Sequence, residues 1–160
     1  FIKNKNFILR KIMQNKIKKI NLLNIKKQIN KDSLMIGVRM FEEAPKKIRD
    51  KFGGLENFSF YNKNIKNLKK KFKNCFVFTT ANNNFIKKHI KIKFKTINNN
   101  KSYFGNDLEN LILMSSFKNF IISNSTYYWW AAYVANYKNK INVKCSRKFT
   151  NRDTILKKWS

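Results

Sequence analysis

The segment FIISNSTYYWWAAY, residues 120–133, places four small polar residues between a short apolar run and a longer, mostly apolar stretch. Residues 120–122 predict a buried strand, and the apolar residues that follow the polar four occupy most sides of a helix. A helix N-terminus at the carboxyl end of a parallel strand presents unpaired N–H groups and a partial positive charge. The junction therefore predicts a phosphate site with a helix N-cap, formed by Ser123, Asn124, Ser125 and Thr126.

Strand, polar turn and buried helix also follow one another in α/β proteins that bind nothing at that place, so the order of elements alone leaves both interpretations open. The detailed pattern is more specific. Residues 122–132 resemble the signature of the α-1,2-fucosyltransferases, glycosyltransferase family 11: an Ile-Ser-Asn-Ser-Ser/Thr run, an aromatic residue, a small or aromatic residue, Trp-Trp and a small pair. Upstream, the residues that match the acidic and leucine-rich helix of that family are Asp107, Leu108, Leu111, Met114 and Ser115.

This resemblance implies both a fold and an activity. The fold is α/β, a Rossmann-like parallel sheet flanked by helices, as in the C-terminal, donor-binding domain of a GT-B glycosyltransferase. The activity is that of an inverting galactoside 2-α-L-fucosyltransferase, which transfers L-fucose from GDP-fucose to an oligosaccharide acceptor ending in galactose, in cell-surface glycan such as the O-antigen of lipopolysaccharide. No metal or other cofactor is required. With 160 residues, the chain is expected to be a fragment that needs a missing N-terminal domain for activity.

The resemblance also assigns catalytic candidates near residue 40. Residues 33–43, SLMIGVRMFEE, stand where the family has a strand ending in His-x-Arg-Arg-x-Asp. Arg39 falls on the first arginine, which is expected to steady the diphosphate of the leaving group, and Glu42 falls on the acidic position. Gly37 replaces the histidine and Met40 the second arginine. An ion pair that merely orients Arg39 at a loop is the alternative for Glu42, and no general base can be assigned.

Further donor contacts are expected at Thr80, Trp129 and Trp130. Residues 75–84, CFVFTTANNN, replace a strand that ends in Ser-Asp-Asp in the family, so hydroxyls and amides stand where carboxylates would accept hydrogen bonds from guanine. A glycosyltransferase with a different nucleotide-sugar donor is therefore one alternative function. The two tryptophans lie in the signature, although bulky residues of a buried helix more often form core and cleft wall.

Strand and helix patterns alternate along the chain, which predicts a parallel sheet covered on both faces around one core. A boundary near residues 30–33 divides a basic helical lead-in, residues 1–31, from a Rossmann-like nucleotide-sugar donor-binding domain, residues 32–160. Asn106 with Glu109 three residues later also predicts a capped helix. The expected strands are 34–39, 76–79, 90–94, 120–122 and 141–144, and the expected helices are 61–72, 107–116, 126–137 and 154–159.

The formal net charge of +28 would ordinarily suggest a nucleic-acid partner. Only five of the 36 basic residues are arginine, however, and the lysines are spread over the solvated faces of expected helices, so no nucleic acid is expected. A non-enzymatic basic module that binds nucleic acid or an anionic surface remains the alternative from another functional class.

The lead-in predicts two basic amphipathic helices that either pack against the missing domain or touch an anionic membrane. No apolar run is long enough to span a bilayer. The lack of a disulfide framework predicts a cytoplasmic protein, and the resemblance implies peripheral contact at the inner face of the membrane. Cys75, Cys145 and His89 are isolated in the sequence, so no metal site is expected.

Overall fold

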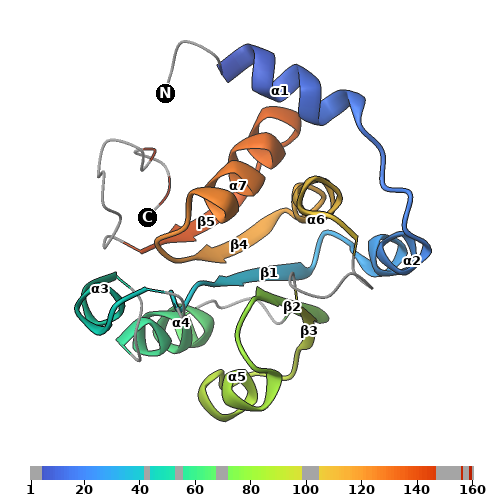
Figure 1. Cartoon of the computed structure of the whole chain (residues 1–160). Helices are drawn as coiled ribbons and strands as arrows, with labels where there is room; N and C mark the ends of the chain where they lie inside the picture. The colour runs from blue at the N-terminus through green and yellow to red at the C-terminus, as the bar shows by residue number, and fades with distance from the viewer. Residues whose placement is uncertain are drawn as a thin grey trace.

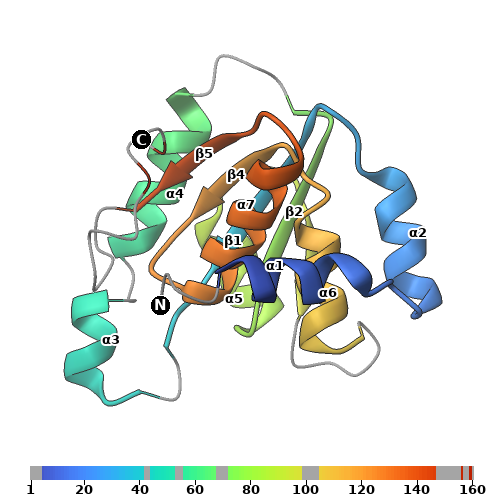
Figure 2. The same ribbon diagram turned by 90° about the horizontal axis from the view of Figure 1, so that it is seen from above.

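The structure is a computed structural model in which five parallel strands form a sheet with helices on both faces (Figure 1). It describes residues 5–41, 44–52, 56–67, 72–98 and 105–146, together with Leu156 and Trp159. Figure 2 shows the same sheet from above, with α1, α6 and α7 lying over it.

The sheet has the strand order β3-β2-β1-β4-β5, and every neighbouring pair is parallel. The chain starts in the middle, adds strands toward one edge, and then crosses back to add β4 and β5 on the other side. In such a sheet the loops after β1 and β4 leave in opposite directions and open a crevice at their carboxyl ends. The strands are β1 (Ser33–Val38), β2 (Asn74–Thr79), β3 (Lys95–Asn98), β4 (Asn119–Ile122) and β5 (Asn142–Cys145).

The helices divide between the two faces of the sheet: α1, α6 and α7 lie on one, and α4 and α5 on the other (Figure 1). Each central strand is buried along nearly its whole length because both of its faces are covered, as expected for a parallel sheet. The helices are α1 (Lys5–Gln14), α2 (Ile20–Gln28), α3 (Lys46–Phe52), α4 (Glu56–Asn67), α5 (Asn83–His89), α6 (Asp107–Met114) and α7 (Thr126–Lys138).

Two apolar clusters form the core, one on each face. Met35, Phe76 and Phe120 point toward α6 and α7, whereas Leu34 and Ile121 point toward α4 and α5. This alternation follows from the strand period of two residues. The Rossmann-like α/β fold predicted from the sequence is confirmed.

Most expected elements lie within a few residues of the observed ones, with two corrections. The expected strand at 90–94 is wrong: Ile90 caps the end of α5 through a bond from its N–H to Ile86 O, and pairing with β2 begins only at Lys95. Its apolar residues instead pack against the α4 side of the core. The helix expected at 61–72 is α4, which begins earlier. Of the expected helix at 154–159, only Leu156 and Trp159 are described, and neither is helical.

The lead-in shares the core of the sheet domain. Leu9, Ile12, Ile17 and Leu22 are buried in the same cluster as α6 and α7, because α1 and α2 present an apolar side to that face. Glu109 adds a polar connection, since its carboxylate accepts hydrogen bonds from the N–H groups of residues 18 and 19. The division of the chain at residue 32 stays a prediction, but the contacts of the lead-in show that it stabilises the sheet.

Candidate functional site

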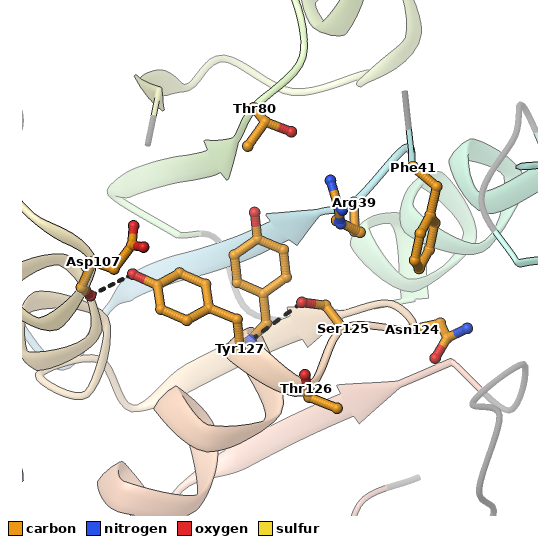
Figure 3. A pocket seen from close by; sticks show the side chains of 9 residues that line it. Arg39, Phe41, Thr80, Asp107, Asn124, Ser125, Thr126 and Tyr127 are labelled. Atoms are coloured by element: carbon orange, nitrogen blue, oxygen red, sulfur yellow. Dashed lines mark hydrogen bonds between the residues drawn. The ribbon is translucent and has the colours of Figure 1, made fainter. Parts of the chain in front are cut away.

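A cleft of about 520 Å³ lies at the carboxyl ends of the central strands, where the strand order reverses (Figure 3). Open α/β sheets bind ligands at this topological switch point. Loops after β1, β2 and β4 contribute to the lining, as do the first residues of α6 and α7. The lining residues are Arg39, Phe41, Thr80, Asp107, Asn124, Ser125, Thr126, Tyr127 and Tyr128.

The N-terminus of α7 forms one wall of the cleft. Ser125 is its N-cap, with φ −148° and ψ 120°, and its Oγ accepts a long hydrogen bond of 3.5 Å from the N–H of Tyr128. Helix geometry leaves the first-turn N–H groups, including those of Thr126 and Tyr127, without intrahelical acceptors. Asn124, Ser125 and Thr126 therefore line a wall that offers N–H donors and a partial positive charge, which suits an anionic group.

Ser123 differs from its three neighbours. It is fully buried at the end of β4 and does not line the cleft, and its side chain lies beside the buried phenol of Tyr61. Its carbonyl accepts a 2.8 Å hydrogen bond from the N–H of Ser125, which shapes the turn into α7. Of the four residues expected to bind phosphate, three reach the cleft and Ser123 lies beneath it.

Arg39 supplies the cation of the cleft. It follows directly after β1, and its guanidinium carbon lies 4.8 Å from the centroid of the Phe41 ring (Figure 3). Phe41 has φ 56°, in the left-handed region that non-glycine residues rarely adopt, so the chain turns sharply just after the arginine. Glu42, the other catalytic candidate, lies outside the described residues, and its role stays a prediction.

Thr80 and Asp107 complete the lining. Thr80 lines the cleft directly after β2. This is the strand that ends here without the two acids of the family's Ser-Asp-Asp pattern. Asp107, the first residue of α6, brings a carboxylate to the cleft, and its backbone O accepts a 2.6 Å hydrogen bond from the Tyr127 phenol. Burial, and secondarily the charge of Asp107, raises the pKa of Tyr127. Sequence reasoning did not include Asp107 in the site because an acid in the first turn of a helix is usually explained by the helix dipole.

The sequence model of glycosyl transferase family 11 matches residues 3–160. The chain belongs to glycosyl transferase family 11. Membership of this family supports fucosyl transfer as the general activity and implies a nucleotide-sugar donor and a sugar acceptor. A search of curated proteins and a search of solved structures each found no match.

In this family 11 chain the two tryptophans of the signature lie away from the cleft lining. Trp129 is buried, stacks on Tyr133 at 4.8 Å between ring centroids, and meets Trp159 at 5.8 Å. Trp130 packs edge-on against Trp129 on the outer side of the same cluster. Both tryptophans pack in the cluster that holds α7 on the sheet. Their donor-binding role stays a prediction, and neither ring is among the residues that line the cleft.

Gly37 stands where the resemblance places the family's histidine. The space beside it is occupied by a side chain of α7. A Cβ atom added to Gly37 would lie 2.5 Å from Cγ of Tyr128, so the tyrosine ring occupies the space that a side chain on β1 would need. The Tyr128 phenol then reaches the backbone carbonyls of Val38 and Phe78. No signal in the sequence predicted this contact, because it joins residues 91 positions apart.

The described part of the chain contains neither a cluster of metal ligands nor a membrane-spanning helix. No group of three or more His, Cys, Asp or Glu side chains there could hold a metal ion. Burial raises the pKa of Cys75 to about 11 and of Cys145 to about 12, so both thiols stay protonated at neutral pH. None of the described helices combines the length and the apolarity needed to cross a membrane.

Proposed function

We propose that the cleft binds the GDP-fucose donor and that the protein transfers L-fucose, with inversion, to the 2-hydroxyl of a galactoside. The observation that carries this proposal is that Arg39 and the N-terminus of α7 line the same cleft at the switch point of the sheet. A diphosphate between them would meet a guanidinium fork on one side and helix N–H groups on the other. Family membership supports the sugar that is transferred.

The chemical step needs stabilisation of the leaving group. As the bond between C1 of fucose and the phosphate oxygen breaks, negative charge grows on GDP, and Arg39 with the N–H groups of Thr126 and Tyr127 would stabilise it electrostatically. The acceptor hydroxyl attacks from the opposite side and loses its proton to a general base. No general base is assigned, and Glu42 stays the acidic catalytic candidate that the resemblance implies. Asp107 is proposed to accept hydrogen bonds from donor hydroxyl or amino groups. No metal or other cofactor takes part in this proposal.

The remaining features of the proposal concern the surroundings of the site. The acceptor is an oligosaccharide ending in galactose, as in O-antigen, and an N-terminal domain would supply most acceptor contacts. The reaction would take place in the cytoplasm, with peripheral contact at an anionic membrane surface. The exposed side chains of Phe7, Met13 and Ile20 on the basic lead-in are consistent with such contact.

Calorimetric titration with GDP and GDP-fucose tests the donor site. Arg39→Ala is expected to weaken GDP binding by about tenfold or more, since a charge-assisted hydrogen bond contributes about 1.5–3 kcal/mol. Arg49→Ala, which removes the same charge from an exposed position on α3, is the matched control and should bind GDP like the parent chain. Equal weakening by both variants would show non-specific attraction to the basic chain and contradict the donor site.

Two alternatives give different results in the same assay. Thr80 at the position of the missing acids favours a looser choice of nucleotide, so UDP or ADP binding that exceeds GDP binding would indicate another donor. A basic module would instead retain RNA, lose it steeply as salt is raised, and show no difference between the Arg39 and Arg49 variants.

A further inference from the structure

Tyr128 joins the ends of two strands as well as lining the cleft. It is 2% exposed, and its phenol donates a three-centre hydrogen bond to Phe78 O at 2.9 Å and Val38 O at 3.3 Å. These carbonyls belong to neighbouring strands, β2 and β1. The phenol therefore connects the two strands at the edge of the sheet that faces the cleft.

The position of this connection matters because the strand ladder ends there. The last pair between β1 and β2 is Val38 with Thr79. Beyond this pair the segments that follow β1 and β2 separate and lead to Arg39 and Thr80, which line the cleft. Val38 O belongs to the peptide that leads directly into Arg39. A bond that holds both carbonyls thus restricts the starting points of both cleft loops.

Gly37 makes this arrangement possible. The ring of Tyr128 lies so close to β1 that a Cβ at residue 37 would approach its Cγ, Cδ2 and Cδ1 to 2.5, 2.6 and 3.0 Å. The contact is with the rigid base of the ring, whose far end is held by the two carbonyls, so the ring cannot swing aside without losing its hydrogen bonds. Gly37 and Tyr128 consequently form one structural unit across the sheet and α7.

We propose that Tyr128 is a positioning residue of the donor site, which acts through Arg39 and Thr80 by holding the carboxyl ends of β1 and β2 together. The proposal rests on the proposed donor-binding function for its binding readout, and on the geometry alone for its spectroscopic readout. The Tyr128 side chain does not itself take part in the chemical step. Its hydroxyl sets where the guanidinium and the threonine stand relative to the N-terminus of α7.

The test compares Tyr128→Phe with Ser115→Ala in the full chain. Ser115 is also buried, and its hydroxyl donates a 2.8 Å hydrogen bond to Ile112 O at the C-terminal end of α6, away from the cleft lining. Both variants lose a buried hydroxyl that donates to a backbone carbonyl. Tyr128→Phe is expected to weaken GDP binding about tenfold, whereas Ser115→Ala should bind GDP within about twofold of the parent chain.

A double-mutant cycle separates positioning from direct contact. If Tyr128 acts through Arg39, the Tyr128→Phe change should weaken binding much less in an Arg39→Ala background than in the parent chain. Full additivity would mean that the phenol contacts the ligand itself and would overturn the proposal, as would GDP binding by Tyr128→Phe that equals the parent's or is matched by Ser115→Ala.

Nuclear magnetic resonance gives a readout that needs no ligand. Tyr128→Phe should shift the Arg39 Nε–H and Thr80 amide resonances, and Ser115→Ala should leave both in place. If the parent chain binds no GDP, the proposed function fails, while these shifts still decide the positioning role. Unchanged Arg39 and Thr80 resonances in Tyr128→Phe would overturn the inference whatever the binding result.

Discussion

The guanidinium of Arg39 lies over the ring of Phe41, 4.8 Å from its centroid, because Phe41 adopts φ 56° and turns its side chain back toward the end of β1. A cation over an aromatic face gains about 0.5–1 kcal/mol at an exposed site, and a non-glycine residue in the left-handed region costs roughly 1–3 kcal/mol. The turn at Phe41 therefore positions the Arg39 guanidinium at some cost in the free energy of folding.

Phe41→Gly tests this balance. Glycine accepts positive φ without strain, so we expect the free energy of unfolding to stay within about 1 kcal/mol of the parent value despite the lost ring contact. GDP affinity should nevertheless fall severalfold, since Arg39 loses one of its supports. Urea denaturation and calorimetry measure the two effects. Phe41→Leu keeps the strained turn without the ring, and unaltered GDP binding by both variants would contradict a supporting role for Phe41.

Ser125→Ala removes the N-cap of α7. The hydrogen bond to Tyr128 N is long, so we expect a loss of about 0.5–1 kcal/mol in unfolding free energy, the lower part of the range for N-caps. GDP binding should weaken as well. Asn82→Ala is the control: Asn82 caps α5 through bonds to two N–H groups and does not line the cleft. Equal effects of both changes on GDP binding would indicate general destabilisation.

Glu109 should make stability depend on pH. Its carboxylate accepts hydrogen bonds from Lys18 N at 2.6 Å and Lys19 N at 3.0 Å, and these bonds hold its pKa below the ordinary value of 4.5. A lowered pKa in the folded state means stabilisation that is present above pH 4.5 and is lost as the pH falls through the folded-state pKa.

Glu109→Gln is therefore expected to be less stable than the parent chain at pH 7, and the difference in unfolding free energy should shrink below pH 4.5. Chemical denaturation at a series of pH values measures it, at constant high salt because the chain carries +28 formal charge. Asp50→Asn, which changes an exposed carboxylate on α3, serves as control. A stability difference between Glu109→Gln and the parent that is independent of pH would argue against the charged cap.

Gly37→Ala should destabilise the protein by about 1–3 kcal/mol, because the added methyl group meets the base of the Tyr128 ring. Thermal unfolding measures this loss. In a Tyr128→Leu background the same substitution should cost clearly less, since the aromatic ring is gone and its hydroxyl no longer fixes the side chain. Equal costs in both backgrounds would show that something other than Tyr128 excludes a side chain at residue 37.

Local patterns in the sequence were sufficient to predict β1, β2, β4, β5 and α7, because each is an apolar run or period bounded by polar turn residues. The N-cap of α7 and the place of Arg39 at the end of β1 were predicted in the same way, helped by the resemblance to family 11, and their binding roles stay predictions. The strand expected at 90–94 was misplaced because alternating apolar residues can pack beneath a sheet without joining its ladder. Whether a segment pairs with β2 depends on where the folded chain places it. The sequence of the segment alone does not carry that information.

Tertiary structure alone brought Asp107 into the cleft, left Ser123 and Trp129 outside its lining, and set Tyr128 against Gly37. These outcomes depend on the strand order and on the way α6 and α7 cross the sheet, and so on contacts between residues far apart in the chain. The sequence specifies which side chains are available near each strand end. Packing of the helices on the sheet decides which of them face one another across the cleft.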